Sequence, residues 1–405
     1  MPGNSNVPAI RFAGFTDPWE QCKLGEVAEI IGGGTPDTNN PNYWDGDIDW
    51  YSPAELGEQI YADASQRRIT REGYENSSAK MLPADKTILF TSRAGIGTTA
   101  ILRRSACTNQ GFQSLALRDE VNVYFIYSMS DRIKAYAESK ASGSTFLEIS
   151  GRQLAEMDLM LPNRAEQDAI GSFFAQLDDL ITLHQRKHDK LTTLKKSMLE
   201  KMFPKEGADI PEIRFAGFTD PWEQRKLGEL GTIYTGNTPS TVVEEYYASS
   251  GTPWATPTDI NGSPFLQTDK SLTEAGLKVA RTVPTGSILC TCIASIGKNA
   301  ITQTTCGFNQ QINALVPNKN EYDSYFLYTE SAIWSAGMKR NAAAATMQIV
   351  NKTEFSELST AMPSLPEQRK IGTFFQQLDH LITLHQRQLD SLKKVKRSCL
   401  DKMFV

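Results

Sequence analysis

Two stretches of the chain carry apolar residues at alternating spacings of three and four, which is the pattern of a long amphipathic helix. The first stretch follows Pro162 and the second follows Pro363. Sustained over about four heptads, this spacing predicts a coiled-coil seam. The predicted seam positions are Ile170, Phe173, Leu177, Leu180, His184, Leu191, Leu194 and Met198 in the first stretch, and Ile371, Phe374, Leu378, Leu381, His385, Leu392, Val395 and Cys399 in the second.

Upstream of each long stretch the apolar runs are short, rich in β-branched residues and interrupted by Gly, Pro and Asn, which indicates strands joined by tight turns. Clear examples are the runs Thr87–Thr91 and Ser287–Thr291. Short helices are predicted over Val123–Ala141 and Tyr322–Arg340. Each upstream part is therefore expected to be a mixed α+β globule of roughly 150 residues, a usual domain size.

The chain repeats itself. The run Ile10–Gln21 returns unchanged as Ile213–Gln224, and Leu180–Arg186 returns as Leu381–Arg387. Between these identical blocks the two copies diverge. Two copies of one module of about 200 residues are therefore expected. The identical framework would face the same kind of partner twice, and the divergent parts would face something that varies.

The predicted fold class is α+β, with two globular domains separated by two long helices in an internally repeated, pseudo-two-fold arrangement. An antiparallel coiled coil would place the globules at opposite ends, and the helices would act as a spacer of fixed length between them. Parallel helices would place both globules side by side, and the helices would then not act as a spacer. For the helices alone, a generic dimerisation coiled coil is the alternative. The expected boundaries are residues 1–165 and 213–366 for the globules, 166–203 and 367–405 for the helices, and 204–212 for the linker.

Composition excludes several classes of protein. Apolar residues make up 40% and charged residues 22% of the chain, which is typical of a globular protein, and no apolar run approaches the roughly 18 residues of a membrane span. The N-terminus does not resemble a signal peptide, so a cytoplasmic location is expected. The six cysteines lack CxxC spacing and are expected to be free thiols. Of the four histidines, only His184 and His188 have a spacing that suits a metal, so no metal site is expected.

The net charge of −5 argues at first against a nucleic-acid ligand. Basic residues are nevertheless clustered, in Gln185–Lys205, in its counterpart in the second repeat, and in a zone of the first globule that includes Arg67, Arg68, Arg71 and Arg93. A solvated charged face explains any one such cluster equally well.

Catalytic motifs are incomplete, and they differ between the two copies. Asn40-Pro41-Asn42-Tyr43 is one residue short of the loop that holds the target nitrogen in amino-methyltransferases, and the second copy lacks its prolines. Lys298 is followed by Asn299, which does not fit a P-loop. A nuclease-like Pro36-Asp37 becomes Pro239-Ser240. Because chemistry shared by both copies should survive in both, this chain is not expected to be an enzyme.

Small and polar elements do survive in both copies, and they suit contacts with DNA. Asn and Gln amides pair with adenine, and glycine-loop N–H groups suit phosphates. Because these elements are common to both globules, a role as loop framework is favoured over base reading, and base readers are sought where the copies differ. The candidate DNA-binding residues are Thr35, Arg67, Arg68, Arg71, Arg93, Gly95, Gly97, Asn109, Gln110, Thr238, Lys270, Lys278, Lys298, Asn309 and Gln310.

An ordered set of short motifs, found twice, resembles the specificity (S) subunit of type I restriction-modification enzymes. The set comprises a G-x-T-P turn, a W-x-x-P element, an Asn-Gln step before a strand, a later small-residue step, a strand end followed by proline, and a Glu-Gln-x-x-Ile helix start. Its members are Gly33–Pro36 and Gly236–Pro239, Trp50–Pro53 and Trp254–Pro257, Asn109-Gln110 and Asn309-Gln310, Ser144-Thr145 and Ala345-Thr346, Leu161-Pro162 and Met362-Pro363, and Glu166–Ile170 and Glu367–Ile371. Ala345 and Gln311 depart from the family's serine and glycine.

The resemblance implies two target recognition domains, each reading half of a split, asymmetric site in double-stranded DNA. It also implies that the helices dock two methyltransferase (M) subunits and that restriction (R) subunits join the full complex. S-adenosylmethionine would then belong to the M subunit, ATP and Mg to the R subunit, and no cofactor to this chain. Two alternatives are a coiled-coil scaffold whose globules bind proteins, and a single-chain enzyme with an unrecognised site.

Overall fold

The computed structural model describes residues 6–93, 95–142, 147–205, 207–260, 268–343 and 349–405. The predicted steps Ser144-Thr145 and Ala345-Thr346 lie outside the described residues. The chain forms two compact units: the first comprises Met1–His184 with Gln388–Val405, and the second comprises Gln185–Arg387. Each unit therefore contains one globule, the first part of its own long helix and the last part of the other long helix.

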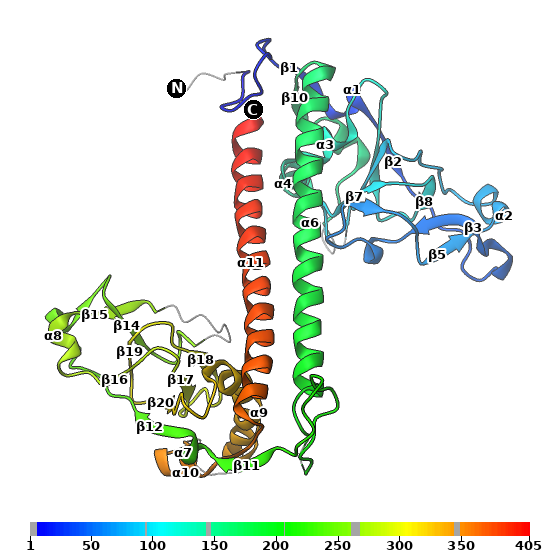
Figure 1. Ribbon diagram of the computed structural model, residues 1–405. Coiled ribbons are helices and arrows are strands. Elements are labelled where there is room, and N and C mark those ends of the chain that lie inside the picture. Colours follow the sequence, from blue (N-terminus) through cyan, green and yellow to red (C-terminus); the bar gives the residue numbers. More distant parts are fainter. Residues whose placement is uncertain (1–5, 94, 143–146, 206, 261–267, 344–348) are drawn as a thin grey trace. The chain divides into compact units, whose positions relative to one another are not determined.

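The first unit is built on a five-stranded sheet of order β2-β9-β6-β7-β4, a three-stranded sheet of order β5-β3-β8, and the antiparallel pair β1-β10 (Figure 1). The predicted strand Thr87–Thr91 is confirmed as β6. The strands are β1 (Glu20–Lys23), β2 (Ala28–Gly32), β3 (Trp44–Tyr51), β4 (Tyr61–Ala62), β5 (Arg67–Ile69), β6 (Thr87–Phe90), β7 (Thr99–Leu102), β8 (Ala106–Thr108), β9 (Gln113–Leu117) and β10 (Asp158–Leu161).

The helices of the first unit are short except for α6, which continues into the second unit. The helix predicted over Val123–Ala141 is present but broken at Met129. The helices are α1 (Leu24–Val27), η1 (Pro41–Tyr43), η2 (Pro53–Glu55), α2 (Arg71–Glu75), α3 (Val123–Ser128), α4 (Ser130–Lys140), α5 (Gly151–Ala155) and α6 (Arg164–Lys201).

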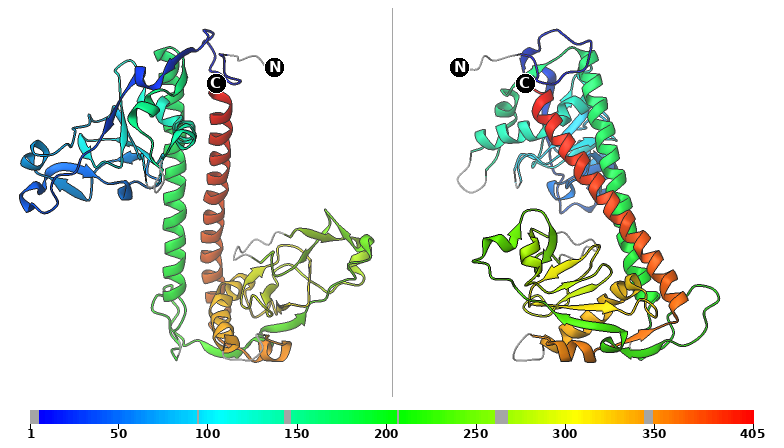
Figure 2. Two further views of the ribbon diagram at one scale, coloured as in Figure 1. Left: turned by 180° about the vertical axis from the view of Figure 1, so that it is seen from behind. Right: turned by 60° about the vertical axis from the view of Figure 1, so that its left-hand side comes forward.

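The second unit repeats this plan with a four-stranded sheet of order β12-β20-β17-β18, a five-stranded sheet of order β13-β15-β14-β19-β16, and the pair β11-β21 (Figure 2). The predicted strand Ser287–Thr291 is confirmed as β17. The strands are β11 (Glu223–Lys226), β12 (Gly231–Thr235), β13 (Tyr247–Ala248), β14 (Thr252–Ala255), β15 (Lys270–Leu272), β16 (Thr282–Val283), β17 (Ile288–Thr291), β18 (Asn299–Ile301), β19 (Cys306–Phe308), β20 (Ile312–Pro317) and β21 (Ser359–Met362).

The helix predicted over Tyr322–Arg340 is confirmed as α9, and it packs beside β17 and β18. The helices of the second unit are α7 (Leu227–Leu230), η3 (Glu244–Tyr246), α8 (Glu274–Leu277), α9 (Ser324–Ala343), α10 (Lys352–Glu357) and α11 (Leu365–Met403). The two predicted long helices thus begin two residues after Pro162 and Pro363. Pro366 lies in the first turn of α11, where proline is tolerated because the first N–H groups of a helix have no intrahelical partner. Among the described residues, none of the helices is long and apolar enough to cross a membrane.

The end of α11 is part of the core of the first unit. Phe404 packs its ring against Trp19, Phe125 and Phe174 at centroid distances of 6.2, 5.3 and 5.8 Å. The backbone N–H of Ile10 donates to the carbonyl oxygen of Lys402 at 2.9 Å. The N-terminal arm thereby satisfies a carbonyl that the end of the helix would otherwise leave unpaired.

The second unit makes the same joint with the end of α6. Phe203 packs against Trp222, Phe326 and Phe375 at 5.8, 5.6 and 5.9 Å. The N–H of Ile213 donates to the carbonyl oxygen of Lys201 at 2.8 Å. The identical runs that begin at Ile10 and Ile213 are therefore explained by one structural task, which is to hold the end of a long helix.

A bidentate ion pair fixes each N-terminal arm to the first turn of a long helix. Arg11 donates to both carboxylate oxygens of Glu166 at 2.6 and 2.7 Å, and Arg214 donates to those of Glu367 at 2.7 and 2.8 Å. Both carboxylates are buried. The Glu-Gln motif at the helix starts thus has a structural role, because planar guanidinium-carboxylate pairing fixes geometry as well as charge.

Candidate nucleic-acid interface

In the first unit, the turn that follows β2 presses against the end of β8. A Cβ atom added at Gly33 would lie 2.2 Å from the carbonyl oxygen of Thr108, so only glycine allows this approach. The N–H of Gly34 donates to the same carbonyl at 2.8 Å. Thr35 then donates its hydroxyl to the side-chain oxygen of Gln110 at 2.6 Å. The turn brings two of the predicted residues, Thr35 and Gln110, into contact.

The second unit builds the same turn from its own residues. A Cβ atom added at Gly236 would lie 2.1 Å from the carbonyl oxygen of Asn309. Thr238 donates its hydroxyl to the side-chain oxygen of Gln310. We call this arrangement of the glycine turn and the Asn-Gln step, present once in each unit, the polar loop cluster.

Within the polar loop cluster the asparagine and the glutamine have different positions. The side-chain oxygen of Asn109 accepts the N–H of Gly111 at 2.8 Å, and that of Asn309 accepts the N–H of Gln311 at 3.0 Å. Both asparagines therefore hold their own turn, as framework residues do. The side chains of Gln110 and Gln310 are exposed instead, so their amide groups remain accessible.

A hairpin loop joins β6 to β7 beside the polar loop cluster of the first unit. Thr91 organises this loop, because its hydroxyl donates to the Gly95 carbonyl at 2.6 Å and accepts the N–H of Thr98 at 2.9 Å. The N–H of Ser92 donates to the Gly111 carbonyl at 2.8 Å, which ties the loop to the Asn-Gln turn. Gly95 and Gly97 adopt positive φ angles of 107° and 86°, and Arg93, in the same loop, is half-buried.

The corresponding loop of the second unit joins β17 to β18. The hydroxyl of Thr291 donates to the Ser295 carbonyl and accepts the N–H of Lys298 at 3.0 Å. The N–H of Cys292 donates to the Gln311 carbonyl at 2.8 Å. In both units this loop is therefore tied to the Asn-Gln turn, and it carries a basic residue, Arg93 in the first unit and Lys298 in the second.

A cation lies over an aromatic ring at matched positions of the outer strands. The guanidinium carbon of Arg67 is 3.7 Å from the ring centroid of Trp44 and 5.5 Å from that of Trp50. The ammonium of Lys270 is 5.7 Å from the centroid of Tyr247. These contacts hold each cation in place, and neither cation has an acidic partner among the residues that the structure describes, so its charge remains available to a ligand.

Other predicted cations have acidic neighbours. Arg68 lies 3.2 Å from the carboxylate of Asp49, and Arg71 lies 2.7 Å from that of Glu75. Lys278 is exposed directly after α8. The DNA-binding role of these residues stays a prediction.

The sequence pattern identified the cations Arg67 and Lys270 but not the aromatic rings beneath them. Trp44 and Tyr247 occupy the same position in the two repeats, and this recurrence of an aromatic residue was the available signal. Arg103, which belongs to the basic zone of the first globule but not to the candidate residues, lies 3.8 Å above the ring of Tyr61.

The structure corrects the predicted seam of the long helices. Ile170, Leu177, Ile371 and Leu378 are buried, as predicted. Four predicted positions lie on the outside instead: Leu180, Leu194, Leu381 and Val395, which are 45, 41, 40 and 46% exposed. His184, Leu191, Met198, His385, Leu392 and Cys399 are half-buried. Ile181, Lys195, Ile382 and Lys396 are half-buried next to these four exposed positions, and Phe174 and Phe375 are fully buried next to Phe173 and Phe374.

Phe173 and Phe374 were also assigned to the seam, and both face the N-terminal arms. Phe173 packs edge-on against Phe12 at 5.7 Å, and Phe374 packs edge-on against Phe215 at 6.2 Å. The observed inner face is therefore shifted by one residue from the predicted one at these positions. Such a shift preserves the alternating spacing of three and four, which is why the pattern alone did not distinguish the two.

Buried carboxylates hold the helices together within each unit. In the first unit, Asp178 accepts the hydroxyl of Tyr124 at 2.9 Å and the ammonium of Lys396 at 2.6 Å. Because Phe174 contacts Phe404 in the same unit, residue numbers rise along α6 while they fall along α11. The two helix segments in this unit run antiparallel.

The second unit contains the equivalent group. Asp379 accepts the hydroxyl of Tyr325 at 2.8 Å and the ammonium of Lys195 at 2.6 Å. Phe203 contacts Phe375, so these helix segments also run antiparallel. Burial, followed by the nearby Asp379 charge, raises the pKa of Tyr325, and the phenol remains a proton donor to the carboxylate.

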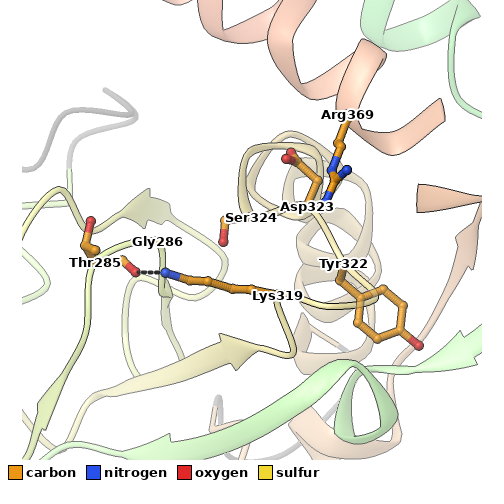
Figure 3. A pocket seen from close by; sticks show the side chains of 7 residues that line it. All are labelled: Thr285, Gly286, Lys319, Tyr322, Asp323, Ser324 and Arg369. Carbon is orange, nitrogen blue, oxygen red and sulfur yellow. Dashed lines mark hydrogen bonds between the residues drawn. The ribbon is translucent and has the colours of Figure 1, made fainter. Parts of the chain in front are cut away.

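A polar cavity of about 300 Å³ opens beside the start of α9 (Figure 3). Lys319 crosses it and donates to the Thr285 carbonyl at 3.0 Å. Asp323 and Arg369 lie on the other side of the cavity, and Asp323 caps α9 by accepting the N–H of Phe326 at 2.8 Å. Lys319 and Asp323 are engaged in structural contacts, which gives the cavity a supporting role. Among the residues that the structure describes, no group of three His, Cys, Asp or Glu side chains is placed to hold a metal.

Comparison with known proteins connects this repeated geometry to one family. The family model described as "Type I restriction modification DNA specificity domain" matches twice, over residues 16–193 and 219–394. The type I restriction enzyme MjaIX specificity subunit of Methanocaldococcus jannaschii is 25% identical over 95% of this chain and 92% of its own length. The EcoR124I/EcoR124II specificity subunit of Escherichia coli is 29% identical over 39% of this chain and 40% of its own length.

The fold itself has a solved relative. The S subunit of a type I restriction-modification system from M. genitalium superimposes with a TM-score of 0.66 over 98% of this chain and 99% of its own, at 16% identity. The two matches of the family model fall on the two repeats, and each includes the polar loop cluster of its unit. The chain therefore belongs to the family of type I restriction-modification DNA specificity subunits.

Proposed function

We propose that each unit binds one half of a bipartite, asymmetric site in double-stranded DNA, and that this chain gives a type I restriction-modification complex its sequence preference. The observation that carries the proposal is that the polar loop cluster is built twice with the same hydrogen bonds, while nearby charged positions differ. Arg67 and Lys270 are paired with the same strand position in the two units, yet Arg71 is replaced by Glu274. A shared framework with different side chains suits two different half-sites.

The chain itself would act without catalysis. Methylation of adenine would take place in the M subunits with S-adenosylmethionine, and DNA cleavage in the R subunits with ATP and Mg. The incomplete motifs of the sequence support this division, because each has lost its key residues in at least one copy.

The two long helices would form one antiparallel coiled coil that sets the spacer between the half-sites. The antiparallel contacts inside each unit support this role. A spacer set by protein geometry would be fixed in length, and half-sites about 34 Å apart would lie on one face of the duplex.

The outer faces of the long helices would dock the M subunits. Leu180, Leu183 and Leu194 are 45, 45 and 41% exposed, and at 100° per residue they lie within about 60° of one another around α6. The stripe recurs on α11, where the equivalent Leu381, Leu384 and Val395 are 40, 41 and 46% exposed. Apolar side chains aligned on a helix face favour a protein partner, and two equal stripes suit two copies of one partner.

The experiment that tests this function is co-expression with the cognate M subunit, followed by sequencing of the host DNA for methylated adenine. The expected result is a bipartite motif with a fixed gap that disappears when this chain is omitted. Replacing residues 25–160 with the same span of a relative should change one half of the motif and leave the other half and the assembly intact. A stable complex without any motif would favour the scaffold alternative and contradict the proposal.

A further inference from the structure

A second cavity of the second unit, of about 330 Å³, is lined by lysines from three different elements. Lys195 comes from α6, Lys298 from the loop between β17 and β18, and Lys339 from α9. None of the described residues that line this cavity is acidic. Three ammonium groups directed at one cavity create a positive potential that attracts anions.

The lysines differ in how far their charge is already compensated. Lys195 is paired with Asp379 at 2.6 Å. Lys298 and Lys339 are exposed, and within the described ranges neither makes an ion pair or a side-chain hydrogen bond. Two uncompensated ammonium groups are therefore available in the cavity, and ammonium groups bind phosphates as point charges.

A phenol and a fixed wall complete the cavity. Tyr328 lines it, and its hydroxyl makes no hydrogen bond with any residue that the structure describes. Burial, together with the nearby Asp379 charge, raises the pKa of Tyr328, so the hydroxyl stays a donor. Asn299 donates to the Ser331 carbonyl at 3.1 Å and to the Ser335 hydroxyl at 2.9 Å, which fixes the wall between the loop and α9.

Hydrogen bonds link the loop that carries Lys298 to the polar loop cluster of the same unit. The N–H of Lys298 donates to the Thr291 hydroxyl at 3.0 Å. Cys292, the first residue after β17, donates its N–H to the carbonyl of Gln311, which follows Gln310 directly. A duplex bound at the cluster would thus pass close to the cavity.

The first unit lacks the two uncompensated cations. Thr98 and Glu138 stand where the second unit has Lys298 and Lys339. Lys396 and Tyr127 of the first unit are the equivalents of Lys195 and Tyr328. The framework of the cavity is therefore common to both repeats, but its cations differ: the second unit has Lys298 and Lys339, whereas the first unit places Lys134 beside Gly97, the equivalent of Gly297.

We infer that the cavity formed by Lys195, Lys298 and Lys339 binds a backbone phosphate of the DNA next to the half-site of the second unit. This inference rests on the proposed function and adds a contact that does not depend on base sequence. It makes the two halves of the recognition site unequal, because Lys298 and Lys339 have no cationic equivalents at positions 98 and 138 of the first unit.

The test uses the complex with its M subunits and a duplex that carries the methylated motif. The dissociation constant is measured against salt concentration for the wild type and for the Lys298→Ala/Lys339→Ala variant. The slope of log K against log salt should fall by about 1, because each phosphate contact contributes about 0.9. The affinity should fall for every sequence, and the preferred motif should stay the same. The matched control is Thr98→Ala in the first unit, which should leave the slope unchanged.

A second measurement locates the phosphate. A neutral methylphosphonate is placed at one backbone position at a time around the second half-site. One position should weaken the wild-type complex and have no further effect on the double variant. An unchanged salt slope in a variant that still recognises its motif would overturn the inference. Loss of M-subunit binding with an unchanged slope would also overturn it, because the cavity would then bind a protein carboxylate. Failure of the wild-type complex to select any motif would instead contradict the proposed function.

Discussion

Lys195 Nζ lies 2.6 Å from the carboxylate of Asp379, and this ion pair joins the end of α6 to the start of α11 within the second unit. The carboxylate side chain is 4% exposed, and it also accepts the hydroxyl of Tyr325. Lys396 and Asp178 form the same pair in the first unit, also at 2.6 Å. Lys396 lies 201 residues after Lys195, and Asp379 lies 201 residues after Asp178. The ion pair therefore belongs to the repeated module. A buried carboxylate with two donors specifies one helix register, because a slip would leave the charge unpaired.

Asp379→Ala should therefore destabilise the second unit. Removing one member of a buried ion pair leaves the other charge and the phenol without their partner, at a cost of about 3 kcal/mol. The free energy of unfolding is measured in urea for the variant and for the wild type. Glu200→Ala, an exposed residue of α6, is the matched control and should change it by less than about 0.5 kcal/mol. Equal values for the two variants would show that the ion pair does not hold the helices.

Glu330 should make the stability of the second unit depend on pH. It is buried on α9, one of its oxygens accepts the Thr360 hydroxyl at 2.5 Å, and the other has no partner among the described residues. Burial raises the pKa of Glu330 well above its usual value. The folded protein therefore binds this proton more tightly than the unfolded chain, so the stabilisation is complete below about pH 4.3 and is lost as pH rises through the folded pKa.

The variant that tests this is Glu330→Met, because Met129 occupies the equivalent position in the first repeat. Urea unfolding is measured at about pH 5 and pH 8. The variant should be more stable than the wild type at the higher pH, by about 1–3 kcal/mol, since a buried unpaired oxygen has been removed. The difference should shrink at the lower pH. An identical pH dependence for the two proteins would mean that Glu330 does not titrate in this range.

The sequence predicted the long helices well because their signals are local. Pro162 and Pro363 mark the starts, and the alternating apolar spacing continues to the ends of α6 and α11. The register of the inner face was not predictable in the same way. Leu194 is more hydrophobic than Lys195, so pattern reasoning placed the leucine inside. The structure places Lys195 there, since its alkyl stem packs while its ammonium reaches Asp379.

The exchange of helix ends between units was also outside the reach of sequence patterns. It depends on contacts such as Ile10 with Lys402 and Trp19 with Phe404, which join the two extremes of the chain. At the candidate interface, the common motifs identified the polar loop cluster. They did not reveal that the side-chain oxygens of Asn109 and Asn309 accept backbone N–H groups of their own turns, because that depends on the backbone path after each residue.

Gly33→Ala should disrupt the first polar loop cluster, whereas Gly95→Ala should be tolerated better. A Cβ at Gly33 would meet backbone oxygens at 2.2 Å, while one at Gly95 has nothing within 4 Å and strains only the backbone, with φ at 107°. The expected cost is more than about 2 kcal/mol at Gly33, and about 1 kcal/mol at Gly95. Thermal unfolding measures the cost, and methylation sequencing should show loss of one half-site for Gly33→Ala. Equal destabilisation by both substitutions would contradict the close-approach argument.

Arg93→Ala should weaken DNA binding by the first unit. Arg93 lies in the hairpin loop tied to the Asn-Gln turn, and no ion pair compensates its charge among the residues described. Loss of one cation that contacts DNA is expected to raise the dissociation constant roughly tenfold, which corresponds to about 1.4 kcal/mol. Arg71→Ala is the comparison, because the charge of Arg71 is already paired with Glu75 at 2.7 Å. If Arg71→Ala had the larger effect, the outer helix α2 would be the better candidate for the DNA contact.

Two lysine substitutions on α6 separate the packing of the helices from partner docking. Leu177 is 6% exposed and packs inside the first unit, whereas Leu183 is 45% exposed on the outer stripe. Leu177→Lys buries a charge and should lower the free energy of unfolding by more than about 3 kcal/mol. Leu183→Lys should leave that free energy within about 0.5 kcal/mol of the wild-type value and reduce co-purification of the M subunit. Undiminished M binding by the folded Leu183→Lys variant would exclude this stripe as the docking surface. Loss of M binding by Leu177→Lys alone would reflect unfolding, so the outer substitution is the one that decides.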